Sequence, residues 1–201
     1  MSRYTGPRNK RARQIGEDLG LKSNSLKVAK RIGIRPGQHG AKGRRKLSDY
    51  GIQLKEKQKM KYIYGITEKQ LRQLYDKASN SSLATGEQLM SLLERRLDNV
   101  IYRLGWANTR AAARQLVSHG HLFVNGRKLD VPSYTVKVDD VVNLTVRTTA
   151  IPAVSEALKE DNAIPAWLEK KQAAAKISRL PQRSDVSEAI EEQMVIEYYS
   201  R

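Results

Sequence analysis

Apolar residues are sparse along the first 47 positions and follow neither a helical nor a strand period. The segment contains Gly6-Pro7 and Arg35-Pro36-Gly37, and basic residues stand between these turn signals. Composition of this kind is typical of chain that cannot bury a core of its own. We therefore expect residues 1–47 to form an extended basic arm, either disordered or ordered only against a partner.

Helical periodicity begins at Ser48, which can cap a helix that Gly65 would end. A second helix is predicted after the capping box Thr67–Gln70, because apolar residues then recur at the spacing of one buried stripe. The end of the chain carries a strongly acidic helical pattern. We expect a helical domain at residues 48–90 that residues 163–201 complete.

A further helix should carry apolar residues from Leu89 to Leu104 on one face and end at Gly105. Thr109 can cap a shorter helix that begins at Arg110 and stops before Gly120. These two helices form the first part of the segment 91–150. After them, the spacing of apolar residues changes from that of a helix to that of a strand.

Strand signals follow the helices of residues 91–150. Asn125-Gly126 stands between short apolar runs and predicts a two-residue hairpin turn, because both residues tolerate positive φ. Val142, Leu144 and Val146 alternate with polar residues as in a strand. The predicted fold class is α+β: a helical domain with an inserted unit of two helices and a small twisted antiparallel sheet. Residues 151–162 would be a linker.

The positive charge is concentrated at one end of the chain. The sequence has 37 Lys and Arg against 21 Asp and Glu, and residues 1–62 supply 18 of the basic and 4 of the acidic residues. This segment thus carries most of the net charge of +16, which indicates a polyanionic partner. Nucleic acid is favoured over an anionic membrane, because the basic segment lacks the wide apolar face that inserts into lipid.

Several other classes of protein are disfavoured. The chain has no cysteine, which excludes disulfides and zinc ribbons. No apolar run approaches the roughly 18 residues of a membrane span, and the first residues lack the apolar core of a secretory signal. His39, His119 and His121 lack the spaced partners of a metal site or a nucleophilic triad. We expect no catalytic residue, no metal and no cofactor.

Arginine pairs supply candidate nucleic-acid contacts. Arg110 and Arg114 are four residues apart and should point outward on the same side of their helix, and Arg96 and Arg103 are two turns apart. A guanidinium group fits phosphate oxygens in pairs. For the neighbouring Arg95 a second interpretation stays open, which is an ion pair with Glu94 or Asp98.

Two other groups also have two interpretations. Lysines at every second position from Lys55 to Lys61 spread around a helix, so they form either a solvated surface or a face against phosphates. His119 either caps its helix or contacts the nucleic acid. The complete set of candidate contacts is Arg3, Arg8, Lys10, Arg11, Arg13, Lys42, Arg44, Arg45, Lys46, Lys55, Lys57, Lys59, Lys61, Arg96, Arg103, Arg110, Arg114, His119, His121, Asn125 and Arg127.

Four motifs follow one another in the second half of the chain: Glu94–Val100, Thr109–Val117, Gly120-His121 and Val124-Asn125-Gly126. Together they resemble the S-four RNA-binding domain, which recurs in many RNA-binding proteins. The resemblance implies that the polyanion is RNA.

The segments on either side of these motifs resemble a more specific family. They are Arg3–Pro7, Arg35–Gly40, Ser48–Gly51, Glu56–Lys59, Tyr64-Gly65 and Glu197–Arg201. These are similar to bacterial or organellar ribosomal proteins of the S-four family, in order and over essentially the whole chain. The resemblance implies a primary rRNA-binding protein of the small subunit, which docks on a junction of rRNA helices and nucleates assembly of the subunit body.

The family resemblance also implies partners and a location. They are small-subunit rRNA, mRNA at the entry side, and other small-subunit proteins, especially protein five, at an interface that influences translational accuracy. The location would be the ribosome in the cytoplasm, or in the plastid stroma for an organellar protein. In one respect the chain departs from many bacterial relatives, which carry zinc-binding cysteines in the arm where this sequence reads Asn9–Ala12.

Two other functions compete with this interpretation. An RNA-modifying enzyme with an appended S-four domain would need a large catalytic domain, which the roughly 50 residues after position 150 cannot supply. In a DNA-binding architectural protein, the helix of Arg110 and Arg114 would act as a recognition helix. An assay of rRNA against duplex DNA at matched salt separates these functions.

Overall fold

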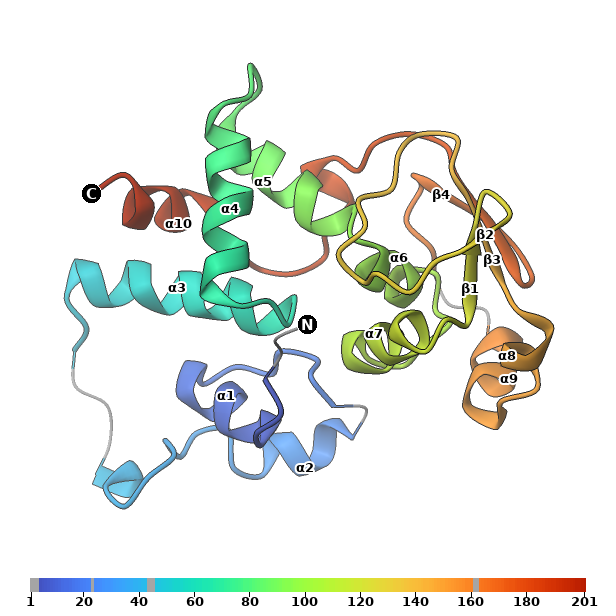
Figure 1. Cartoon of the computed structure of the whole chain (residues 1–201). Helices are drawn as coiled ribbons and strands as arrows, with labels where there is room; N and C mark the ends of the chain where they lie inside the picture. The colour runs from blue at the N-terminus through green and yellow to red at the C-terminus, as the bar shows by residue number, and fades with distance from the viewer. Residues whose placement is uncertain (1–3, 23, 43–45, 161–162) are drawn as a thin grey trace. The chain divides into compact units, whose positions relative to one another are not determined.

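The computed structural model describes residues 4–22, 24–42, 46–160 and 163–201 (Figure 1). The chain divides into two compact units. The first unit comprises residues 1–86 and 188–201, and the second unit, residues 87–187, is inserted between these two parts of the sequence.

The first unit is helical. Its elements are α1 (Arg8–Ile15), α2 (Ser25–Ala29), η1 (Gly40–Lys42), α3 (Asp49–Ile63), α4 (Glu68–Ser79), the start of α5 (Thr85–Glu94), and α10 (Glu192–Tyr199). The predicted caps are confirmed: the Ser48 hydroxyl accepts the Gly51 N–H, and Thr67 and Gln70 form a reciprocal capping box. Helix α10 packs against α3, so the last residues of the chain belong to this unit.

The N-terminal segment is folded, and the expectation of an extended arm is wrong. Ala12, Ile15, Leu19 and Val28 are all buried, and α1 lies against α3. Helix α1 ends at Gly16, which has a φ of 85° and donates its N–H to the Ala12 carbonyl. The first three apolar residues are spaced as on one helical face, and the structure shows that this small set is enough to seat the segment.

Two arginines also hold this segment through contacts within the protein. The Arg11 guanidinium lies 3.5 Å from the ring centroid of Tyr4 and 4.4 Å from that of Tyr62. Arg13 donates from Nε to the Ile34 carbonyl at 2.8 Å. These contacts join α1 both to α3 and to the loop that follows α2.

The second unit combines helices with a five-stranded antiparallel sheet, which confirms the α+β class. Besides the rest of α5, its elements are α6 (Leu97–Arg103), α7 (Arg110–Ser118), β1 (Leu122–Val124), β2 (Arg127–Lys128), β3 (Val141–Leu144), α8 (Val146–Thr149), α9 (Pro152–Lys159), β4 (Leu168–Lys171), β5 (Ala174–Ile177) and η2 (Arg183–Asp185). The strand order is β2-β1-β3-β5-β4. Helices α6 and α7 pack together beside this sheet and share its core, in which Trp106 and Trp167 are fully buried (Figure 1).

The segment 163–187 does not complete the helical unit, contrary to expectation. Strands β4 and β5 pair with each other, and β5 pairs with β3 through Val142 opposite Ala175. Ala175 and Ile177 are buried in the core of the second unit. Without β5, the outer edge of β3 would present unpaired backbone groups to solvent. The expected linker 151–162 is also largely helical, because α9 occupies most of it.

The single helix expected from Leu89 to Leu104 is two helices, α5 and α6. At Arg96 the backbone is extended, with φ −67° and ψ 134°. Arg96 forms a bridge with Thr135, and the Leu97 N–H donates to the Tyr134 carbonyl at 2.8 Å. These backbone bonds interrupt the helix although its apolar period continues. Val146, expected in a strand, starts α8 instead.

Candidate nucleic-acid interface

The four lysines of α3 are engaged within the first unit. The Lys55 and Lys59 ammonium groups lie 3.3 Å and 2.6 Å from the Glu17 carboxylate. Desolvation opposes ionisation of Glu17, but the hydrogen bonds from these lysines outweigh it and lower the pKa of the carboxyl. Both ammonium groups therefore already have an anionic partner.

Glu68 pairs with the other two lysines in the same way. Lys57 lies 2.9 Å and Lys61 3.0 Å from its two carboxylate oxygens. Burial would raise the pKa of Glu68, but these two hydrogen bonds and a third from Tyr199 lower it to about 2. Each ammonium group on α3 therefore faces a carboxylate, so these lysines do not form a row of unpaired cations.

Arginines of the second unit also form ion pairs in its interior. Arg96 donates to both oxygens of Asp98, at 3.1 Å and 2.8 Å, and Arg114 donates to Asp98 at 3.0 Å. All three residues are buried. The expectation that Arg114 points outward beside Arg110 is wrong, because the Asp98 carboxylate draws it into the interface between α6 and α7.

A second buried carboxylate, that of Glu94, binds Arg103 directly and is linked to Arg110 through Asn99. Arg103 donates twice to Glu94, at 2.8 Å each. The Asn99 amide also donates to Glu94, and its oxygen accepts from Arg110 Nε at 2.8 Å. The Arg110 guanidinium also lies 4.3 Å from the ring centroid of Tyr102. These contacts fix α5, α6 and α7 relative to one another within the second unit.

Arg95 forms neither of the ion pairs considered for it. Its Nε donates to the Val136 carbonyl at 3.0 Å, and burial lowers the pKa of its guanidinium. The ion pairs are made instead by residues that the sequence had suggested for RNA.

Asn125 mainly holds the hairpin. It has a φ of 49° in the predicted turn, its amide donates to Asp140 at 2.8 Å, and its oxygen accepts the Val141 N–H at 2.9 Å. The two-residue turn is thereby confirmed, and the side chain is committed to ordering it.

An exposed basic surface surrounds the end of α7 and the hairpin; we call it the hairpin surface. His119 closes α7 with its backbone N–H, while its imidazole is exposed and lies 6.1 Å from the ring of His121. Lys128 crosses over Gly120, where a Cβ would lie 2.5 Å from the Lys128 side chain. A cavity of about 330 Å³ opens here, and its lining residues are Ser118, His119, Gly120, Lys128 and Asp130. Arg127 is exposed next to it.

A second exposed basic surface covers the N-terminal segment; we call it the N-terminal surface. Its described cations that form no ion pair with another described residue are Lys10, Lys22, Lys30, Arg31, Arg35, Lys42 and Lys46. Arg8 is also exposed and reaches the Leu21 carbonyl at 3.5 Å. Arg3, Arg44 and Arg45, which were candidates too, lie outside the described residues.

Some of these cations were not among the candidates taken from sequence. Lys22, Lys30, Arg31, Arg35 and Lys128 were omitted. The first four belong to the basic run of the N-terminal segment, and that run was the signal in the sequence that could have identified them. Lys128 is adjacent to the candidate Arg127. Its position over Gly120 results from the fold of the hairpin, which the sequence alone does not show.

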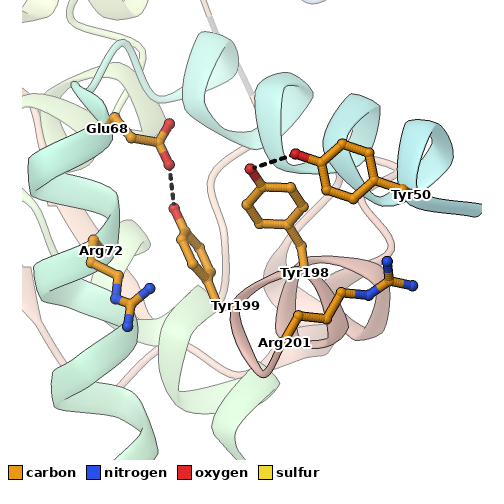
Figure 2. A pocket seen from close by; sticks show the side chains of 6 residues that line it. All are labelled: Tyr50, Glu68, Arg72, Tyr198, Tyr199 and Arg201. Carbon is orange, nitrogen blue, oxygen red and sulfur yellow. Dashed lines mark hydrogen bonds between the residues drawn. The ribbon is translucent and has the colours of Figure 1, made fainter.

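A third surface joins α3, α4 and the end of α10 in the first unit (Figure 2). The Tyr50 and Tyr198 hydroxyls are 3.4 Å apart, and the Tyr199 hydroxyl donates to Glu68 at 2.8 Å. Burial and the Glu68 carboxylate raise the pKa of Tyr199 well above its ordinary value. We call this group the tyrosine cluster; it lines a cavity of about 350 Å³ and comprises Tyr50, Glu68, Arg72, Tyr198, Tyr199 and Arg201.

The described residues contain no group of three or more His, Asp or Glu side chains placed to hold a metal ion. Among the described helices, none combines the length and the apolar character of a membrane span.

Comparison with known proteins agrees with the two-unit organisation. Residues 3–94 match the family described as "Ribosomal protein S4/S9 N-terminal domain", and residues 95–142 match the S4 domain. The chain is 48% identical over 208 residues to small ribosomal subunit protein uS4 of Chloroflexus aurantiacus, and 45% identical over 203 residues to that of Brevibacillus brevis. It is 48% identical over 204 residues to uS4 of Parabacteroides distasonis, and each comparison covers the whole of both chains. This family is a structural, non-enzymatic component of the ribosome, which agrees with the expectation that the chain is not an enzyme. The chain belongs to the uS4 family of small ribosomal subunit proteins.

Proposed function

We propose that the protein is a primary rRNA-binding protein of the small subunit, located on the ribosome. It would dock on a junction of rRNA helices, nucleate assembly of the subunit body and contribute to translational accuracy near the mRNA entry side. The observation that supports RNA binding is that the basic side chains fall into two groups, one paired within the protein and one exposed. The lysines of α3 and the arginines Arg96, Arg103 and Arg114 are paired with carboxylates, whereas the basic side chains of the N-terminal and hairpin surfaces are exposed.

Exposed cations favour RNA binding for a physical reason. A Lys or Arg that contacts phosphate releases condensed counterions, and this release supplies much of the affinity. A cation that is already paired inside the protein would have to give up a carboxylate first. Cations carried by folded elements also suit double-helical RNA, which is read through its backbone geometry.

The test is binding of the full-length protein to small-subunit rRNA, to an RNA of scrambled sequence and to duplex DNA at matched salt. We expect a clear preference for the rRNA and a steep loss of affinity as salt rises. Equal affinity for duplex DNA would favour an architectural DNA-binding protein instead.

A second proposal concerns protein partners. We propose that the tyrosine cluster is the docking surface for another small-subunit protein, with protein five as the candidate. Tyrosine and arginine are enriched at the centres of protein interfaces, where they carry much of the binding energy. In the cluster, Tyr50 is exposed and Arg201 lies 5.9 Å from its ring.

This docking proposal can be tested with purified protein five. Tyr50→Ala should weaken its binding at least tenfold, as expected for an aromatic residue at an interface centre. Leu83→Ala, which removes an exposed apolar side chain elsewhere in the same unit, is the matched control and should leave binding unchanged. Unaltered binding by Tyr50→Ala would place the partner elsewhere.

A further inference from the structure

The loop of residues 34–40 is held in one shape by contacts to its backbone. Arg13 donates from Nε to the Ile34 carbonyl at 2.8 Å and from Nη2 to the Arg35 carbonyl at 3.1 Å. At Gly40, an added Cβ would clash with the Arg35 carbonyl oxygen, so a larger residue cannot occupy that position without moving the loop. The loop is therefore preformed, although it lies in a segment whose sequence suggests an irregular arm.

Unlike the backbone of this loop, its polar side chains are not held by contacts within the described part of the protein. Arg35, Gln38 and His39 are exposed and form no side-chain hydrogen bond or ion pair with any residue that the structure describes. Gln14, on the adjacent α1, accepts the Tyr62 hydroxyl through its amide oxygen at 3.3 Å, which leaves its amide N–H groups as donors. The backbone is thus fixed while the polar side-chain groups are available to a ligand.

These side chains surround a cavity of about 390 Å³, lined by Gln14 and by residues 35–40. Pockets for small ligands range from roughly 300 to 1,000 Å³, so this cavity has room for more than a phosphate group. The lining offers one guanidinium, one imidazole and two amides, and none of its described residues is acidic.

The chemistry of the lining indicates what it can bind. A guanidinium forms paired hydrogen bonds with phosphate oxygens. A side-chain amide presents a donor and an acceptor together, as the edge of a nucleic-acid base does. Proteins read RNA sequence mainly at unpaired bases that project from the helix. We propose that this loop binds one unpaired nucleotide of RNA, with its phosphate at Arg35 and His39 and its base edge at Gln14 and Gln38.

This inference rests on the proposed RNA binding and deepens it. If it holds, the N-terminal segment contributes selectivity as well as charge, because a preformed loop loses little conformational entropy when it binds. Arg13 and Gly40 then act as positioning residues, since they shape the loop without contacting the nucleotide.

The direct test is nuclear magnetic resonance of the full-length protein, titrated with hexamers of single-stranded oligo(A) and oligo(U). Duplex RNA with the same number of phosphates and inorganic phosphate serve as the two comparison probes. The single strands should shift the side-chain amide signals of Gln14 and Gln38 and the Nε–H signal of Arg35. The duplex and inorganic phosphate should leave the two amide signals in place.

Matched variants sharpen this test. Gln38→Ala should weaken binding of the better hexamer about tenfold, the usual contribution of one paired side-chain–base contact. Gln73→Ala removes an exposed glutamine from α4 and should change binding less than twofold. Gly40→Ala alters no charge but should abolish the amide shifts, while the amide signals of α3 show that the unit is still folded.

Three results would overturn the inference. They are amide signals of Gln14 and Gln38 that stay unmoved when the single strands shift other basic residues, identical shifts with duplex RNA, and full binding by Gln38→Ala. None of them affects the binding of full-length protein to rRNA, so a failure here can be told apart from a failure of the proposed function.

Discussion

Replacement of Asp98 by asparagine should make the second unit much less stable. The Asp98 carboxylate receives three hydrogen bonds from two guanidinium groups, and the side chains of Asp98, Arg96 and Arg114 are 7%, 4% and 11% exposed. Asparagine keeps the shape of the side chain and removes the charge. Two buried cations would then lack their shared counter-ion.

The magnitude follows from this burial. Breaking one buried ion pair by removing a partner costs about 3–5 kcal/mol, because it leaves an uncompensated charge inside the protein. We therefore expect the free energy of unfolding of the second unit to fall by about 3–5 kcal/mol, a large part of the stability of a typical domain.

The assay can observe this unit selectively. The chain has two tryptophans, Trp106 and Trp167, and both lie in the core of the second unit. Tryptophan fluorescence during urea unfolding therefore follows the unit that contains Asp98. Asp130→Asn removes an exposed carboxylate and should change the free energy of unfolding by less than about 0.5 kcal/mol. A loss below about 1 kcal/mol for Asp98→Asn would refute the assignment of Arg96 and Arg114 to the interior.

Three further predictions concern the paired carboxylates and the two basic surfaces. Because the pKa of Glu68 is about 2 in the folded protein, below its ordinary value of 4.5, its contribution to stability is present above about pH 4.5 and is lost as the pH falls towards 2. Circular dichroism should show that Glu68→Gln flattens this acid dependence, and an unchanged dependence would contradict it. In limited proteolysis of the free protein, trypsin should cut slowly after Arg11 and Arg13, because α1 packs on α3; rapid cleavage there would mean that the segment is unfolded. Arg127→Ala with Lys128→Ala should lower the salt slope of rRNA binding by about two units without changing tryptophan-detected unfolding, and an unchanged slope would remove the hairpin surface from the interface.

Local signals predicted much of the secondary structure. Ser48 and Thr67 begin helices where their side chains can accept backbone N–H groups, and Asn125-Gly126 forms the expected turn. These features depend on a few adjacent residues, so one sequence is enough to identify them. The strands β4 and β5 depend instead on the pairing of β5 with β3, which is separated from them in sequence. No local sequence pattern predicted that pairing.

The roles of the arginines and lysines were less predictable. Helical spacing gives the direction of a side chain but not what lies opposite it. Arg114 is 16 residues from Asp98, and Lys55 is 38 residues from Glu17. Charge counts correctly favoured the N-terminal third as the basic region, yet they could not separate cations that meet a carboxylate in the fold from cations that remain exposed.

The most direct test of the account compares two charge-matched double variants in a salt titration of rRNA binding. One variant, Lys10→Gln with Lys128→Gln, neutralises an exposed cation on each basic surface. The other, Lys55→Gln with Lys61→Gln, neutralises two cations that are paired with carboxylates in α3. The account predicts that the exposed pair lowers the slope of log K against log salt by about two units, because two phosphate contacts are lost, and that the paired set changes it by less than about half a unit. Equal losses of slope, or a larger loss for the α3 pair, would contradict the claim that the exposed cations bind the RNA and the paired ones hold the fold.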